Sequence, residues 1–446
     1  MTEPAMPKPG LHLIAGRAGA GKTRLLTEAL AAHMRRGERA ILLVPEQHTF
    51  EAERRVAEAA GGLFGVQVLS LERLSERLLQ AAGNRRTFLT AQGVRMVVRR
   101  AALHRQEELR AFSRVARGPG FAAEVAALIA ACKQACISPE MLLSAADALP
   151  AGALLSDKLH DAALLYADVE TYLNGRYLTE DDFYAAATAL LPGSFVDGVP
   201  VYLDGLPAVT RQVFSFLEAL LPVVQSMTVA LTIDDGAPDA DVFGPNAEAW
   251  DALRDMAARL HLPLFERRLT GRRAADPALS HLERRLFAYP DEPYGAAAPA
   301  ITVFGANSRT AEVRAMCDAV LALARDGVRY RDMAVLVSDM DAYGGTLERV
   351  CAARGIPLFL DARRPVRDHA AARLLLCAVR TVAGGFSAPD LLDLIKTGYA
   401  GIAHEDAELF ENRVLRYGVR HSRFLSPFTR GEQAAPAEAV RQAATG

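Results

Sequence analysis

The sequence lacks long hydrophobic runs and contains little cysteine. No stretch approaches the roughly 18 uncharged apolar residues of a membrane-spanning helix, and the opening residues MTEPAMPKPG lack the apolar core of a signal peptide. We therefore expect a cytoplasmic protein with no membrane partner. The five cysteines lie inside apolar helical patterns, which argues against a disulfide framework. We expect buried structural thiols, with a ligand pair at Cys132 and Cys136 as the alternative.

The sequence also has no excess of positive or negative charge. The chain carries 51 Lys and Arg against 53 Asp and Glu, a net charge of −2. Binding to nucleic acid would therefore need local basic patches. The 51% hydrophobic and 23% charged content is typical of a globular protein. A chain of 446 residues is long enough for two or three cores at roughly 100–200 residues per domain.

The most informative stretch that is present is LHLIAGRAGAGKTR, residues 11–24. It reads G-x-x-x-x-G-K-T between a short apolar run and a helical pattern, the context that a P-loop needs. The spacing predicts a phosphate cradle for ATP, in which glycines let backbone N–H groups approach the phosphate oxygens. The helix N-terminus adds its positive end. A chance glycine-rich turn is the alternative. The predicted nucleotide-binding residues are Gly16, Arg17, Ala18, Gly19, Ala20, Gly21, Lys22 for the outer phosphates, and Thr23, whose hydroxyl would bind Mg²⁺.

Strands and helices alternate behind this loop. Apolar runs at 40–44, 66–70, 199–204 and 227–235 are separated by helical patterns. The alternation predicts an α/β fold, a doubly wound parallel sheet of the RecA-like P-loop type with ligands at the carboxyl ends of the strands. Asp204 ends one of these runs, where P-loop proteins place the carboxylate that orders Mg²⁺. Asp also ends strands for turn reasons, which is the alternative.

Other stretches predict how the chain divides. Residues 87–190 lose the strand signal and are interpreted as a helical insertion. Its acidic run Glu180-Asp181-Asp182 follows Thr179, which favours a helix N-terminus over a metal site. Residues 236–300 are rich in turn signals and are interpreted as a domain boundary. A second, smaller α/β unit is predicted to follow, with strands at 301–304, 333–337 and 358–360, and the pattern is helical again from 370.

Several long blocks resemble the AddB subunit of AddAB-type helicase–nucleases, relatives of the superfamily 1 DNA helicases. The blocks are GRAGAGKT, PEQHTFEAE, VLSLERLSERLL, KLHDAALLYADVETYL, VYLDGLPAVTRQVF and RYRDMAVLVSDMDAYGGTLERVCAARGIPLFLDARRPVRDH. The resemblance covers nearly the whole chain and implies four helicase domains. These are a RecA-like domain 1A at 1–86 and 191–290, a helical domain 1B at 87–190, a second RecA-like domain 2A at 291–369, and the truncated start of a helical 2B-like region at 370–446.

The resemblance also implies a function. Members of the family act with an AddA-type helicase–nuclease subunit on single- and double-stranded DNA, in double-strand break repair and homologous recombination. They continue beyond position 446 into a nuclease domain with a cysteine-ligated iron–sulfur cluster. Nothing in this sequence matches that part, so no nuclease residue or cluster ligand is assigned to the chain.

The motor motifs of active superfamily 1 helicases are incomplete. The resemblance aligns Asp204-Gly205 with their Asp-Glu pair, whose Glu positions the attacking water. No glutamine follows Asp234-Asp235, and Ser338-Asp339 stand where an arginine worth roughly 10³- to 10⁵-fold in rate is expected. We therefore expect a subunit that binds ATP and Mg²⁺ but hydrolyses ATP slowly, and we leave open whether this chain alone is an enzyme.

Loops at the carboxyl ends of two strands supply the candidates for DNA contact. The resemblance places Gln47, His48 and Phe50, then Ser70 and Arg73, along a single strand of DNA, where an aromatic ring and polar groups suffice. Core packing is the alternative for Phe50. Arginine clusters are further candidates for phosphate contact, with a solvated face as the alternative for each. They lie at 267–268, 272–273, 363–367 and 413–423.

Functions of other classes stay open. The chain is alternatively an autonomous ATP-driven DNA translocase, a P-loop kinase of small molecules, or only a docking scaffold. A kinase would normally be near 200 residues with an arginine-bearing lid and would need no second α/β unit.

Overall fold

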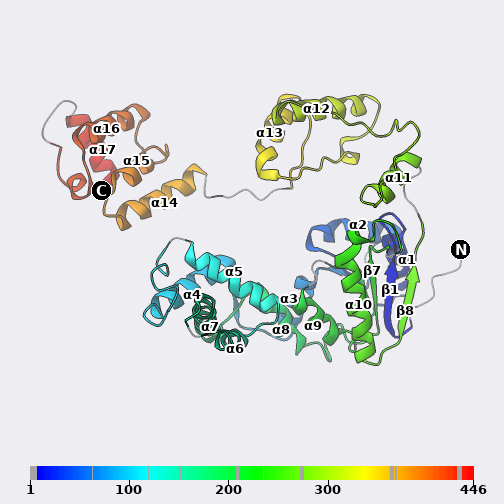
Figure 1. Cartoon of the computed structure of the whole chain (residues 1–446). Coiled ribbons are helices and arrows are strands. Elements are labelled where there is room, and N and C mark those ends of the chain that lie inside the picture. The colour runs from blue at the N-terminus through cyan, green and yellow to red at the C-terminus, as the bar shows by residue number, and fades with distance from the viewer. Residues whose placement is uncertain are drawn as a thin grey trace. The chain divides into compact units, whose positions relative to one another are not determined.

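The computed structural model describes residues 8–62, 64–118, 120–150, 152–206, 210–234, 236–271, 276–361, 366, 369–428 and 434–445. The chain divides into two compact units, Met1–Thr302 and Val303–Gly446. Figure 1 traces the chain through both of them.

A six-stranded parallel sheet forms the centre of the first unit. The strand order is β3-β2-β6-β7-β1-β8, and each neighbouring pair is parallel. Parallel pairing brings the carboxyl ends of all these strands to one edge. The predicted α/β class with a parallel sheet is therefore confirmed for this unit. The strands are β1 Gly10–Ala15, β2 Ala40–Leu43, β3 Val66–Leu69, β6 Val201–Asp204, β7 Ser226–Leu231 and β8 Leu264–Arg268.

Helices cover both faces of this sheet. Alternate residues of a strand point to opposite faces, so Leu11 and Leu13 of β1 belong to one core and Ile14 to another. The first core lies under α3 Leu71–Ala81, α8 Phe183–Thr188, α9 Arg211–Leu220 and α10 Gly244–Arg259. The second lies under α1 Lys22–Arg35 and α2 Thr49–Ala60.

A helical insertion with its own core separates β3 from β6. The predicted insertion is thus helical, with the correction that a short ladder pairs Thr87 with Tyr177 and Phe88 with Leu178. Two-residue strands carry too few residues to show a period, so the sequence pattern missed them. The elements are β4 Thr87–Phe88, α4 Ala91–His104, α5 Phe121–Gln134, α6 Pro139–Asp147, α7 Leu154–Leu173 and β5 Tyr177–Leu178.

Two polar contacts stabilise the local structure of this insertion. The Asp161 carboxylate is completely buried and accepts the backbone N–H groups of Arg110, Ala111 and Phe112 at 2.9, 2.8 and 2.9 Å. The acidic run at 180–182 forms the short 3-10 turn Glu180–Asp182, in which Thr179 and Asp182 cap each other. The predicted helix N-terminus is therefore confirmed.

The stretch 236–300 is less rich in turns than predicted, and the boundary between the two units, after Thr302, lies at its end. This stretch contains α10, β8 and the helix α11, Pro277–Arg285. Pro245 and Pro277 lie in the first turns of their helices, where proline is tolerated because no intrahelical bond needs its missing N–H. Three of the five residues in β8 are charged, which hid an edge strand from the hydrophobic pattern.

The second unit consists of helices in its described residues. The strands predicted at 301–304, 333–337 and 358–360 are wrong, because no segment pairs with them there. Several of their apolar side chains face solvent, since Val303, Leu336 and Phe359 are 90%, 92% and 90% exposed, whereas Val337 and Leu360 pack against a core of this unit. The helices are α12 Arg309–Arg325, α13 Met340–Ala353, α14 Ala370–Ala383, α15 Ala388–Ile395, α16 His404–Tyr417 and α17 Ala434–Thr445.

Four of the five cysteines are buried. Cys136 is exposed just beyond α5, which corrects the expectation that all five are buried.

Within the described residues no single helix is long and apolar enough to cross a membrane, although the bent pair α5 and α6 passes that test together.

Replacing Asp161 by asparagine should destabilise the first unit. The amide keeps one acceptor oxygen but turns an NH₂ group toward backbone donors that cannot accept, so buried N–H groups lose partners. We expect a loss of about 2–4 kcal/mol in urea unfolding followed by circular dichroism. The matched control is Asp157→Asn, which removes only a half-exposed contact with Arg110 at 3.8 Å and should cost less than about 1 kcal/mol. Equal losses would contradict the role of Asp161.

Candidate functional site

Polar loops gather at the carboxyl edge of the parallel sheet. The predicted P-loop, residues 16–23, follows β1, the 3-10 turn Glu46–His48 follows β2, and Asp204 ends β6. Asp234 follows β7 and Leu269 follows β8. The sheet thus brings together residues that are far apart in the sequence.

The P-loop backbone depends on its glycines. Gly19 and Gly21 have φ of 77° and 96°, in the left-handed region that favours glycine. At Gly16 a Cβ would lie 2.8 Å from the carbonyl oxygen of Leu269 and 2.9 Å from the Cβ of Ala20. Gly16 is therefore required for close packing against the segment after β8. Ala18 and Gly19 are exposed, whereas Ala20 is buried.

Lys22 spans the loop from the first turn of α1. Its ammonium donates hydrogen bonds to the carbonyl oxygens of Gly16 at 2.6 Å and Arg17 at 2.8 Å. Burial lowers the pKa of Lys22, and the negative charge of Asp204 acts in the opposite direction. Thr23 follows it, half-buried, on the same turn. The predicted cradle residues therefore come together, with a cation at the mouth of the loop.

Asp204 and Gly205 lie opposite this lysine. Asp204 is half-buried at the end of β6, close enough to affect the pKa of Lys22. Gly205 has a φ of 87°, a conformation in which a side chain is strained. The backbone conformation at position 205 thus favours glycine. The glutamate that active helicases have at the corresponding position is absent.

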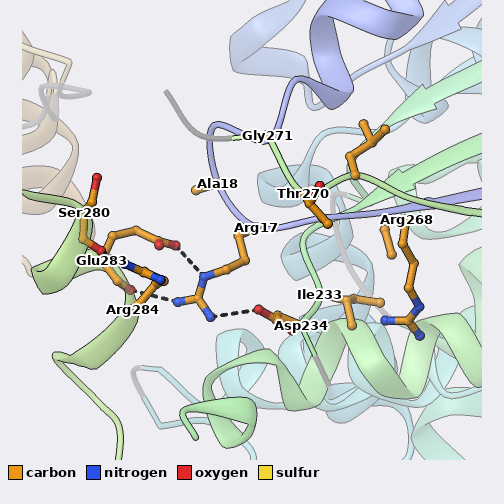
Figure 2. A pocket seen from close by; sticks show the side chains of 13 residues that line it. Arg17, Ala18, Ile233, Asp234, Arg268, Thr270, Gly271, Ser280, Glu283 and Arg284 are labelled. Carbon is orange, nitrogen blue, oxygen red and sulfur yellow. Dashed lines mark hydrogen bonds and ion pairs between the residues drawn. The ribbon is translucent and has the colours of Figure 1, made fainter. Parts of the chain in front are cut away.

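Arg17 is the most strongly paired residue of the site. Its guanidinium donates to both carboxylate oxygens of Asp239 at 2.9 and 2.7 Å, to Asp234 at 3.3 Å and to Glu283 at 2.8 Å. It also lies 5.1 Å from the centre of the Phe243 ring. Figure 2 shows this side chain pointing from the P-loop toward Glu283 and Asp234. Arg17 therefore ties the P-loop to α11 and to the segment after β7.

The hydrogen bonds with Arg17 lower the pKa of Asp239, which is 3% exposed. No local pattern marked Asp239 or Glu283, because both lie in the stretch interpreted as a boundary. Asp276-Pro277 is the sequence signal that could have revealed α11, the helix of Glu283. The Asp276 carboxylate accepts the N–H groups of the first turn of that helix.

A cavity of about 330 Å³ opens beside the P-loop. Its walls come from the loop itself, from the segment after β7, from the end of β8 and from α11 (Figure 2). Gly271 packs against the loop, because a Cβ there would lie 2.8 Å from the carbonyl oxygen of Ala20. The polar residues that line the cavity are Arg17, Asp234, Arg268, Thr270, Ser280, Glu283 and Arg284.

Three of the predicted DNA-contact residues lie at the surface beyond β2. Gln47 and His48 are exposed in the 3-10 turn, and Phe50 is 76% exposed at the start of α2. The alternative of core packing for Phe50 is therefore wrong. An exposed aromatic ring beside exposed polar groups is suited to stacking with a base.

The other two DNA candidates have structural partners. Ser70 is completely buried and its hydroxyl accepts the backbone N–H of Arg73 at 3.2 Å, which caps α3. The exposed Arg73 side chain forms an ion pair with Glu46 at 2.8 Å. Ser70 is thus turned away from solvent, while Arg73 stays accessible.

Several other positions named in the sequence analysis lie in the second unit or outside the described residues. Asp339 caps α13 in the second unit by accepting the N–H of Ala342 at 3.1 Å. Arg413 is buried and lies over the rings of Tyr417 and Phe428. Asp235 and the arginines at 272–273, 363–364 and 367 lie outside the described residues.

Replacing Arg17 by methionine should destabilise the first unit in a pH-dependent way. Without its partner the nearly buried Asp239 carboxylate is unpaired at pH 7, so we expect a loss of about 3–5 kcal/mol in urea unfolding. Because Arg17 lowers the folded-state pKa of Asp239, its stabilisation is complete above the ordinary Asp pKa near 4. It is lost as the pH falls through the lowered value.

The difference between the two proteins should therefore be largest at pH 7 and shrink as the pH falls to 3, because burial without Arg17 raises the pKa of Asp239 in the variant and protonation removes its unpaired charge. Arg24→Met is the control, since Arg24 and Glu28 form an exposed pair worth less than about 1 kcal/mol. A difference that stayed the same at pH 3 would refute the role of this ion pair.

Comparison with known proteins identifies a family and relatives of this chain. The family described as "ADDB, N-terminal" matches residues 13–283. An ATP-dependent helicase/deoxyribonuclease subunit of Pelotomaculum thermopropionicum is 35% identical over 433 residues, which cover 93% of this chain and 37% of that protein. The proteins of the same name from Desulforudis audaxviator and Geobacillus kaustophilus are 34% and 33% identical, over 94% and 92% of this chain and 37% and 38% of theirs. The chain thus spans less than two fifths of the length of these relatives, and it belongs to the family of the AddB N-terminal region.

Proposed function

We propose that this chain is the ATP- and DNA-binding, helicase-like part of a helicase–nuclease complex that acts in double-strand break repair and homologous recombination. In this proposal its own motor turns over slowly, and an AddA-type partner supplies the main motor. The observation that carries the proposal is the Lys22 ammonium, held across a glycine-formed loop beside Asp204.

The chemistry of the loop fits a nucleotide with Mg²⁺. The ammonium of Lys22 rests on two carbonyl oxygens, and phosphate oxygens are stronger acceptors for the same donors. Gly16, Gly19 and Gly21 leave the backbone accessible to phosphate. Thr23 and Asp204 are the oxygen ligands that would hold Mg²⁺, which neutralises phosphate charge when bound. The cavity beside Arg17 is of a size for the nucleoside, since ligand pockets measure about 300–1,000 Å³.

The same site supports slow hydrolysis. Position 205 is a glycine in a left-handed conformation, so it offers no carboxylate to orient water. Arg17, the arginine of the P-loop itself, is held by three carboxylates and is thereby directed away from phosphate. Of the two cations of the loop, Lys22 is therefore the one that would contact the phosphates.

The partner and the substrate are supported less directly. The relatives are named as subunits of an ATP-dependent helicase/deoxyribonuclease, which supports an AddA-type protein as the partner. The exposed Gln47, His48 and Phe50 at the sheet's carboxyl edge support contact with single-stranded DNA.

Replacing Lys22 by alanine should abolish nucleotide binding. Mg²⁺–ATP at 100 times its dissociation constant stabilises a protein by about 2.7 kcal/mol, so it should raise the thermal midpoint of the natural chain and leave that of Lys22→Ala unchanged. Arg24→Ala removes a cation from the same turn of α1, but an exposed one, and should keep the full shift. If Lys22→Ala were protected as well as the natural chain, the proposed site would be refuted.

Turnover tests the slow motor separately. We expect steady-state ATP hydrolysis to stay slow when single-stranded DNA is added. Strong stimulation by DNA, abolished in Lys22→Ala, would instead identify an active translocase.

Replacing Phe50 by alanine should weaken binding of a single-stranded oligonucleotide. Stacking of a base on an aromatic ring is worth about 1–3 kcal/mol, or roughly 5- to 150-fold in affinity. Fluorescence anisotropy at fixed salt would measure the change. Phe64→Ala is the matched control, because Phe64 is 80% exposed but precedes β3, at the amino edge of the sheet. Equal losses in the two variants would argue against a specific role for Phe50.

A further inference from the structure

A long acid-free stretch interrupts the balanced charge of the chain. Between Glu76 and Glu107 the sequence has no Asp or Glu, although the whole chain has 53. The stretch runs through β4 and α4 of the helical insertion. Its basic residues are Arg77, Arg85, Arg86, Arg95, Arg99, Arg100, His104 and Arg105. Among the arginines only Arg85-Arg86 and Arg99-Arg100 are adjacent, so the stretch does not form one dense arginine cluster in the sequence.

The outer face of α4 carries two of these arginines. Arg95 and Arg99 are exposed one helical turn apart, while Val97, Val98 and Ala101 point into the core. In the described part of the chain neither arginine has a carboxylate partner. Like charges four residues apart destabilise a helix, so the fold retains an unfavourable arrangement that a bound anion would relieve.

Exposed arginines on α2 and α10 are paired with carboxylates. Arg55 of α2 meets Glu51 at 2.8 Å, and Arg254 and Arg259 of α10 meet Glu266 and Glu218 at 3.0 Å each. Arg105 marks the end of the stretch, because it pairs with Glu108 and Asp168. Single exposed arginines without a carboxylate partner among the described residues also occur, at Arg35 of α1 and Arg211 of α9, but α4 places two of them one turn apart on one face.

Aromatic rings extend this surface beyond α4. The Arg100 guanidinium lies 4.5 Å from the ring centre of Tyr172 at the end of α7, and that of Arg176 lies 5.8 Å from the same ring. The Tyr172 and Tyr177 rings are stacked at 6.1 Å. A guanidinium held near an aromatic ring by a cation–π contact keeps N–H groups that are able to donate to phosphate.

The β4–β5 ladder adds the last part of the surface. The backbone N–H of Thr87 donates to the carbonyl of Arg176 at 3.2 Å, which places Arg86 beside Arg176. Phe88 follows on β4 and is 39% exposed. The basic residues of the loop, the ladder and α4 therefore lie on neighbouring elements of the insertion.

We propose that Arg95 and Arg99, with Arg100 and Arg176 on Tyr172, form a second DNA contact on the helical insertion, one that binds the phosphate backbone. This inference rests on the proposed function as a DNA-binding subunit and adds a surface away from the P-loop edge. Unpaired arginines interleaved with aromatic rings favour a polynucleotide over an acidic protein. The contact carries no base-reading groups, so it should bind without sequence preference.

The test is the salt dependence of oligonucleotide binding by the full chain. Each phosphate contact contributes about 0.7 to the slope of log K against log salt for a single strand and about 0.9 for a duplex. Arg95→Gln/Arg99→Gln should therefore flatten the slope by about 1.4 or 1.8 and weaken single-strand binding roughly 10- to 30-fold at 0.1 M salt. The measurement is made with a single-stranded and a double-stranded oligonucleotide. The one whose slope changes in the variant is the form of DNA that occupies the surface.

Two further double variants serve as controls. Arg254→Gln/Arg259→Gln removes the same charge from paired positions and should leave the slope unchanged. Arg95→Lys/Arg99→Lys keeps the charge and should retain most of the slope. Unaltered circular dichroism and thermal midpoint would establish that the glutamine variant is folded, as its exposed positions lead us to expect.

Three results would overturn the inference. If the glutamine variant binds like the natural chain while Phe50→Ala binds weakly, DNA is bound at the sheet edge only and the proposed function stands. If the natural chain fails to bind DNA at low salt, the proposed DNA-binding function fails as well. If polyglutamate of matched charge binds as tightly as the oligonucleotide, the surface serves an acidic protein.

Discussion

Parallel pairing of the six strands is the constraint from which the candidate site follows. Since the strands run in one direction, the P-loop after β1, Asp204 at the end of β6 and Leu269 after β8 lie at one edge. An antiparallel strand among them would place its following loop at the opposite edge. Gly16 reflects the same arrangement, because its missing side chain makes room for the carbonyl of Leu269. The geometry of the loop thus depends on a strand far away in the sequence.

Charge pairing separates the arginines of the first unit by role. Arg17 has an arginine's capacity for binding phosphate but is held by Asp239, Asp234 and Glu283. It therefore acts as a tie between segments. Arg95 and Arg99 keep their charge without a protein partner in the described residues. In a chain whose charges nearly balance, such unpaired positions are the ones whose charge remains available to an external anion.

Polar residues at strand ends proved to have two different uses. Ser70 occupies a position where a DNA contact was expected, yet it caps α3 by accepting a backbone N–H. Gln47 and Phe50 stand at an equivalent strand end and face solvent. The sequence pattern is the same in both cases, because capping and ligand binding use the same polar side chains. Burial, which depends on the tertiary structure, distinguishes them.

The sequence by itself determined the P-loop, the strand–helix alternation and the helical insertion, because glycine spacing, hydrophobic period and capping residues act over a few neighbouring positions. Only the tertiary structure decided that β8 lies beside β1, that Arg17 meets Asp239 and Glu283, and that 301–304, 333–337 and 358–360 form no ladder. A strand and an ion pair each need a partner, and the identity of a distant partner is not encoded in the local pattern. Local chemistry therefore predicted the cradle, and the long-range pairing decided what surrounds it.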